Sequence, residues 1–161
     1  MNTKLKLLIL FLLFGIVGYF REFFFVQLNV ILYQKYYNQV NEGVTLASFM
    51  EYFNQYSYST LYYSKYIFTL ASVCIFYGLN YLSLNILNYK KNIKFLNFCY
   101  LLLLTLASAS LLYGYLINNR LQDDEYTLSR WLLGIAQSPI VFIFLVAANE
   151  LNNTLNKKTE L

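Results

Sequence analysis

Four long apolar runs dominate the chain, and polar or charged stretches separate them. A membrane core about 30 Å thick needs about 20 apolar residues in a helix, because each residue rises about 1.5 Å. The runs predict spans at about residues 5–25, 66–87, 95–117 and 131–149. We therefore expect an all-α, polytopic membrane protein that forms a single domain over 1–161, with an outer segment at 26–65 and a cytoplasmic tail at 150–161.

The first apolar run follows a short basic start and so has the outline of a signal peptide. No pair of small residues marks a cleavage site after it, and apolar residues resume directly beyond Arg21 and Glu22. We expect an uncleaved span that continues past these two charges, which then lie near the far headgroups. Residues 27–38 are expected to leave the membrane as an interfacial helix.

The outer segment contains a turn signal at Asn41-Glu42-Gly43, followed by Thr45 as a candidate N-cap. Apolar residues then recur with the i, i+3, i+4, i+7 spacing of a helix. These residues are Leu46, Phe49, Met50 and Phe53. The stretch is too short to cross a bilayer, so it predicts a short amphipathic helix in the first extracytoplasmic loop.

Tyrosines gather between residues 52 and 66, where the outer segment returns to the membrane. Aromatic rings with a polar tip concentrate at the level of the lipid headgroups, so this group is interpreted as an interfacial belt at the start of the second span. An aromatic cage for a cationic ligand is the alternative interpretation.

The fourth run contains the only proline of the chain, Pro139, in the stretch from Gly134 to Pro139. Proline has no N–H to donate and clashes with the carbonyl four residues earlier, here Ile135. This predicts a distorted membrane helix. We expect the second and third spans to supply the polar groups that satisfy the Ile135 carbonyl and the Gln137 amide.

Uncharged polar residues recur along the last three predicted spans and form a candidate polar seam. Its members are Asn80, Tyr81, Asn97, Ser108, Gln137, Ser138 and Pro139. One interpretation is interhelical packing through hydrogen bonds, each worth about 0.6–2 kcal/mol. The other is a small-molecule or lipid site beside the proline, since irregular backbone at membrane depth is tolerated where it lines a cavity.

Composition supports the membrane assignment and narrows the chemistry. The chain is 58% hydrophobic and 12% charged, against about a quarter charged in soluble domains. It has no histidine, and no charged residue falls in the central part of a predicted span. Proton relays and membrane hydrolases usually need such groups, so we expect a non-enzymatic protein with no cofactor and no metal. The basic residues do not cluster as nucleic-acid binding requires, so no nucleic-acid partner is expected.

Basic residues predict the orientation. With the N-terminus in the cytoplasm, the inner links hold seven of the 12 basic residues and a net charge of +5, while the outer links carry −1. Because cytoplasmic loops are enriched in Lys and Arg, both termini are expected on the cytoplasmic side of the cell (inner) membrane.

Arg21, Glu22 and Arg130 are the candidate outer-face contacts, at the outer ends of the first and fourth spans. Arginines there commonly anchor to lipid headgroups. Alternatively, they join the acids at 123–125 in an ionic cluster that locks the helices or receives another protein.

The stretch Phe20-Arg21-Glu22-Phe23-Phe24, together with Arg130-Trp131, Gln137 and Pro139 in the last span, resembles a known pattern. It is similar to small four-span membrane proteins that accompany exosortase-type protein-sorting systems in Bacteroidota. In that family Gln and Pro are adjacent, whereas Ser138 separates them here. The resemblance implies a bacterial protein that works beside a sorting or export machinery.

We therefore expect an accessory or scaffold subunit of a larger bacterial membrane complex, with membrane lipids and a membrane protein or a second copy of the chain as partners. The alternative is a small carrier or a lipid- or small-molecule-binding protein that uses the polar seam. Both functions fit a chain that consists mainly of membrane spans.

The predicted orientation can be tested with reporter fusions. Alkaline phosphatase fused after Asn118 should be active, because that position is expected outside, and the same enzyme fused after Lys158 should be inactive. The reverse pattern of activities would overturn the orientation.

Overall fold

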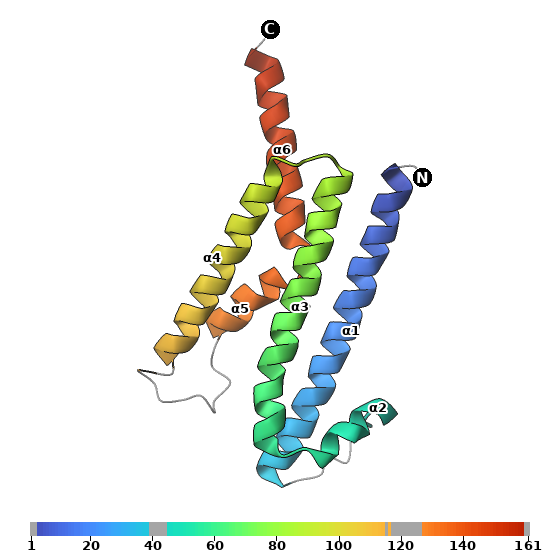
Figure 1. Cartoon of the computed structure of the whole chain (residues 1–161), viewed down its shortest axis with the longest axis vertical. Coiled ribbons are helices and arrows are strands. Elements are labelled where there is room, and N and C mark those ends of the chain that lie inside the picture. The colour runs from blue at the N-terminus through green and yellow to red at the C-terminus, as the bar shows by residue number, and fades with distance from the viewer. Residues whose placement is uncertain (1–2, 39–44, 115, 117–126, 160–161) are drawn as a thin grey trace. The chain divides into compact units, whose positions relative to one another are not determined.

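The computed structural model describes residues 3–38, 45–114, 116 and 127–159, and the regular elements in these residues are all helices (Figure 1). They are α1 (Thr3–Tyr37), α2 (Ser48–Glu51), the 3-10 helix η1 (Tyr52–Gln55), α3 (Tyr58–Ile86), α4 (Asn92–Tyr113), α5 (Thr127–Ala136) and α6 (Ile140–Thr159). The all-α expectation is confirmed. The chain divides into two compact units, a first unit of residues 1–14 and 73–161 and a second unit of residues 15–72.

Within the described residues, α1, α3 and α4 are each long and apolar enough to cross a membrane. Helices α5 and α6 pass the same test together, but they are bent by 66° across the residues that separate them. A polytopic protein with three or four spans is therefore supported. The expected single distorted helix at 131–149 is instead two helices, which the turn and bend residues 137–139 separate.

Helix α1 is one continuous helix of 35 residues, whereas the sequence predicted a span followed by a separate interfacial helix. Arg21 and Glu22 are good helix formers, and neither Gly nor Pro occurs between Gly18 and the end of the helix. The first helix-terminating signal after the charges is Asn38, whose φ of 51° is left-handed. The charged pair therefore changes the polarity of α1 without interrupting it.

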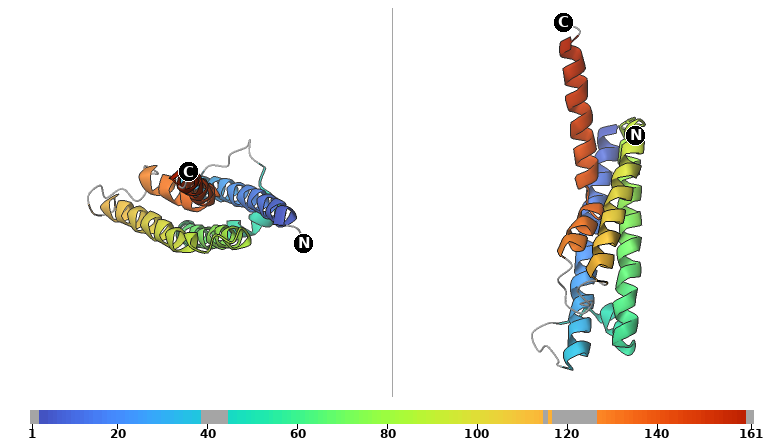
Figure 2. Two further views of the ribbon diagram at one scale, coloured as in Figure 1. Left: turned by 90° about the horizontal axis from the view of Figure 1, so that it is seen from above. Right: turned by 90° about the vertical axis from the view of Figure 1, so that its left-hand side faces the viewer.

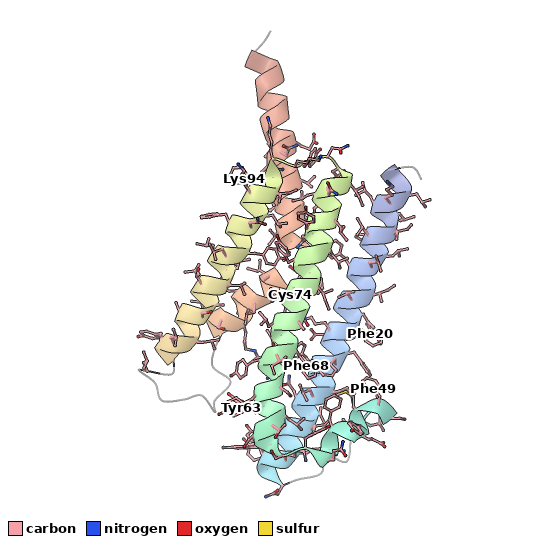
Figure 3. All side chains as sticks on the ribbon, viewed as in Figure 1. Phe20, Phe49, Tyr63, Phe68, Cys74 and Lys94 are labelled. Atoms are coloured by element: carbon pink, nitrogen blue, oxygen red, sulfur yellow. The ribbon has the colours of Figure 1, made fainter. Side chains whose placement is uncertain are left out.

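The second unit has its own core, formed where α1, α2 and α3 meet. The buried residues are Leu28, Ile31, Leu32, Met50 and Leu61. The Phe24 ring packs edge-on against Phe68, with 4.7 Å between ring centroids, and Figure 3 labels Phe68 on α3 and Phe49 on α2. Of the apolar residues expected on one helical face over 46–53, Met50 is fully buried in this core, Phe53 is partly buried against it and Phe49 is exposed.

Contacts from α1 fix the polypeptide around α2. The buried Gln27 side chain accepts a hydrogen bond from the Ala47 N–H at 3.2 Å, and the Lys35 ammonium donates to the Asn54 carbonyl at 2.8 Å. Ala47 is the residue that precedes α2, and it makes no side-chain cap. The expected N-cap at Thr45 is therefore wrong, and Gln27 from another helix satisfies the Ala47 N–H.

The first unit packs α3, α4, α5 and α6 around a second core. Its buried residues are Val73, Leu84, Leu96, Tyr100, Ala136, Val141 and Leu145. Helix α4 packs along both α5 and α6, and the start of α1 joins this unit through Phe14, whose ring lies 6.0 Å from that of Phe76. Figure 2 shows the C-terminal part of α6 extending beyond the link between α3 and α4.

A tight link joins α3 to α4. Asn88 takes a left-handed φ of 60°, and the Tyr89 N–H donates to the Leu84 carbonyl at 3.0 Å, the pattern of a Schellman C-cap. The link also contacts α6, because the Tyr89 hydroxyl donates to the Glu150 carboxylate and the Asn92 amide donates to the Leu145 carbonyl at 3.4 Å.

The contact with α6 predicts that Tyr89 loses its proton at a higher pH than an ordinary tyrosine does. Its hydrogen bond to the Glu150 carboxylate, with a smaller contribution from burial, raises the pKa of Tyr89 above the usual value of about 10. The stabilisation from this bond is therefore complete below pH 10 and is lost as pH rises through the higher pKa of the folded state. NMR of ¹³Cζ-tyrosine should show Tyr89 ionising above the usual tyrosine pKa of about 10, and Glu150→Gln should lower its pKa toward that value.

Candidate functional site: the break between α5 and α6

The break consists of Gln137, Ser138 and Pro139, and helical hydrogen bonds continue up to both of its edges. The Gln137 N–H donates to the Leu133 carbonyl at 2.9 Å, and the Ile143 N–H donates to the Pro139 carbonyl at 3.0 Å. Between these bonds, the last carbonyls of α5 and the first N–H groups of α6 lie outside the regular pattern. Whether hydrogen bonds stabilise the bend therefore depends on the partners of these carbonyl and N–H groups.

Ser138 links the two helix ends. Its hydroxyl donates to the Ile135 carbonyl at 2.7 Å and accepts a hydrogen bond from the Ile140 N–H at 3.3 Å. Ile135 is the residue whose carbonyl loses its helical donor because of Pro139. The expectation that the second and third spans satisfy this carbonyl is wrong, since a residue of the break itself does so.

Two buried side chains from other helices hold the next carbonyls. The Tyr100 hydroxyl of α4 donates to the Ala136 carbonyl at 2.9 Å. Asn80 of α3 donates from Nδ2 to the Tyr100 hydroxyl oxygen at 2.7 Å, and more weakly to the Ser138 carbonyl at 3.4 Å. Asn80 and Tyr100 thus attach the break to α3 and α4, and we call these two residues with Ser138 the break network.

One acceptor within the break network has no donor. Asn80 is 0% exposed, and its Oδ1 is a buried side-chain atom without a hydrogen-bond partner among the described residues. A buried polar atom left in this state costs about 1–3 kcal/mol. Gln137, the first residue of the break, is 4% exposed and is itself engaged in an interaction.

The remaining residues of the candidate polar seam lie outside the break network. Tyr81 and Ser108 are exposed on α3 and α4. Asn97 is also exposed, but its Oδ1 accepts a hydrogen bond from the Tyr77 hydroxyl at 2.8 Å. The Tyr77 ring packs edge-on against the Tyr100 ring. Asn97 therefore contacts the break network only indirectly, through Tyr77.

Tyr100 is the central residue of the break network; the sequence groups it with Asn97 in a loose polar stripe of the third span, but the candidate polar seam does not include it. Helical spacing places it near Asn97 on the third span, but a tyrosine in an apolar run gives no separate signal for a buried hydroxyl. The only signal in the sequence for this role was that an uncharged hydrogen-bond donor on the third span could reach a carbonyl that Pro139 leaves without a donor on the fourth.

The candidate outer-face contacts belong to different units. Arg21 and Glu22 form an ion pair at 3.3 Å in the second unit, and the Arg21 guanidinium lies 5.8 Å from the centre of the Phe25 ring. Arg130 is an exposed residue of α5 in the first unit. The acids at 123–125 lie outside the described residues, so the proposed ionic cluster stays a prediction.

In the part of the chain that the structure describes, no group of three or more His, Cys, Asp or Glu side chains comes together as a metal site would require. Cys74, labelled in Figure 3, is exposed, and Cys99 is half-buried; both are free thiols. The chemistry that the break offers is therefore hydrogen bonding by uncharged groups.

Comparison of the chain with protein-family models, with curated proteins and with solved structures finds no match. The resemblance to exosortase-associated membrane proteins therefore stays a prediction.

Replacing Tyr100 tests the break network. Tyr100→Phe removes the donor to the Ala136 carbonyl and the acceptor for Asn80, leaving buried groups unpaired at a cost of about 1–3 kcal/mol. We expect a lower midpoint of unfolding in a denaturing detergent titration. Tyr81→Phe deletes an exposed hydroxyl from the same predicted seam and should leave the midpoint unchanged; equal shifts for both variants would contradict the network.

Proposed function

We propose that this chain is a non-enzymatic integral membrane protein that serves as an accessory or scaffold subunit of a larger membrane complex. The observation that supports this role is a surface of the second unit that is built from tyrosine. Its composition is that of a protein-recognition surface, and two of its rings, Tyr58 and Tyr62, pack against the small core beneath it.

Tyrosines from the end of α1 and the start of α3 contact one another ring to ring. The distances between ring centroids are 4.6 Å for Tyr33–Tyr37, 4.9 Å for Tyr37–Tyr36, 5.6 Å for Tyr36–Tyr58 and 5.9 Å for Tyr58–Tyr62. Tyr63 and Tyr66 both contact Tyr62, at 5.8 and 5.7 Å. We call this group the tyrosine row.

Much of the tyrosine row remains accessible. Tyr63, labelled in Figure 3, is 68% exposed and Tyr37 is 54% exposed. Tyrosine supplies a large contact area with only two side-chain torsions to fix, which is why it is enriched in protein-binding surfaces and among their energetic hot spots. Mutual packing of the rings reduces that entropy cost further, so the row favours a protein partner.

The backbone of the second unit supports a location outside the hydrocarbon. Residues 45–47 and 56–57 are not helical, and lipid-exposed irregular backbone does not occur within the hydrocarbon layer because its polar groups have no water to bind. We therefore propose that α2, η1 and the adjoining helix ends form an extracytoplasmic surface. The expected cell-membrane location, with cytoplasmic termini, gives that surface access to an export or sorting machinery.

Affinity purification in mild detergent tests this role. Wild-type protein should co-purify with a membrane partner that is identified by mass spectrometry, and Tyr37→Ser with Tyr63→Ser should lower its recovery by about tenfold, the effect of a 1.4 kcal/mol loss. The matched control is Tyr113→Ser, which makes the same change at a similarly exposed tyrosine of α4. Recovery of monomer alone would count against a scaffold.

A small-molecule or lipid carrier is the second candidate, and the buried Asn80 Oδ1 without a donor is the observation that favours it. The variants Asn80→Leu and Gln137→Leu distinguish the two functions. A scaffold with these changes should still co-purify with its partner through the tyrosine row. A carrier should lose its activity while its expression is unchanged.

A further inference from the structure

We propose that the exposed face at the start of α4 binds an anionic phospholipid, with the phosphate held by Lys91 and Lys94 and an acyl chain against Phe98 and Leu101. The inference rests on the membrane location proposed above, but it is independent of the scaffold role. All four residues lie at or near the start of α4, within the first unit.

Positive charge is concentrated in the link between α3 and α4. Lys90, Lys91 and Lys94 fall within five residues, all three are exposed, and Figure 3 labels Lys94 on the first turn of α4. The sequence contains no Asp or Glu between Glu51 and Asp123. In the described part of the chain, none of the three lysines has an ion-pair partner. Their charge is therefore available to an external anion.

The backbone of the link is stabilised by contacts that do not use the lysine side chains. The Tyr89 hydroxyl donates to the Glu150 carboxylate of α6, and the N–H groups of Asn92 and Ile93 donate to the carbonyls of Tyr89 and Lys90 at 2.9 and 3.3 Å. These N–H groups are already bonded, so the lysine side chains supply the charge for an anion. Even with Glu150 counted, three lysines against one carboxylate leave this end of the unit cationic.

From the link inward, one face of α4 carries first charged, then aromatic, then aliphatic side chains. Its members recur at i, i+3, i+7 and i+10, which places them within about 80° of one another around the helix. They are Lys91, Lys94, Phe98 and Leu101, and the two apolar members are 61% and 64% exposed. The opposite face of α4, which holds Leu96, Tyr100 and Ala107, is buried.

The order of side chains on the exposed face matches the order of groups in an anionic phospholipid. Leu101 lies about 10 Å along the helix axis from Lys94, so a phosphate at the lysines leaves its acyl chain beside Phe98 and Leu101. Each lysine near an anionic membrane surface strengthens the attraction by about fivefold. A free phosphate ion would contact only the lysines, whereas a lipid also covers the exposed apolar part of the face.

Fluorescence quenching by brominated lipids tests the site. Trp131 is the only tryptophan of the chain, so in protein with Trp131→Phe and Phe98→Trp the single indole reports which lipid lies beside this face. The protein is placed in bilayers of phosphatidylcholine and phosphatidylglycerol, of which only one carries bromine on its acyl chains. Phosphatidylglycerol should be preferred by about fivefold or more, and Lys91→Gln with Lys94→Gln should bring the preference close to one.

The matched control is Lys157→Gln with Lys158→Gln, which removes the same charge from the tail of the chain and should leave the preference unchanged. Salt provides a second measurement that needs no change to the lysines. Because exposed charges are screened, about 0.5 M NaCl should lower the preference several-fold. The salt series decides the matter even if the double lysine variant does not fold.

Three results would overturn the lipid site. Equal affinity for the two lipids in protein with all its lysines would do so, as would a preference that high salt leaves unchanged. Loss of the preference on adding inorganic phosphate at constant ionic strength would assign the lysines to a free phosphate ion. Failure of either brominated lipid to quench the indole would contradict the membrane location itself, and is distinct from equal quenching by both.

Discussion

Backbone groups in an apolar environment must find hydrogen-bond partners, and this requirement shapes the first unit more than any single side-chain contact. A proline near the middle of an apolar run frees the Ile135 carbonyl and opens a gap of three residues between two helices. The gap persists because Ser138, Tyr100 and Asn80 supply donors to consecutive parts of it. Without these donors, a 66° bend inside an apolar bundle would leave several carbonyls exposed to lipid or apolar side chains.

The second unit is stabilised by a different set of interactions. Its helices are held by apolar burial around Met50 and Leu61, as in a small water-soluble domain, and by local polar contacts such as the one from Gln27 to Ala47. Aromatic rings complete its surface. The same residue type therefore has two uses in this protein: Tyr100 is buried for its hydroxyl, whereas the tyrosine row is exposed for its rings.

The sequence predicted helices where apolar runs exceeded about 18 residues, because run length alone determines what can cross a bilayer. It predicted the proline distortion and the involvement of Asn80 for equally local reasons. It predicted that the first helix continues past Arg21 and Glu22, but not that the same helix runs unbroken through residues 27–37. Nor could it separate Asn80 from Tyr81 or Ser108, because burial depends on how neighbouring helices are rotated, and adjacent positions on a helix differ only by 100°.

Ser138 joins the two helix ends locally, because both hydrogen bonds of its hydroxyl are made to residues within three positions of itself. The local contacts of the bend are therefore encoded in a short stretch of sequence, whereas the contacts from Asn80 and Tyr100 come from the surrounding helices. Such a division makes the turn a portable module: the three residues Gln137-Ser138-Pro139 would be expected to bend an unrelated apolar helix, while the surrounding bundle is free to diverge around them.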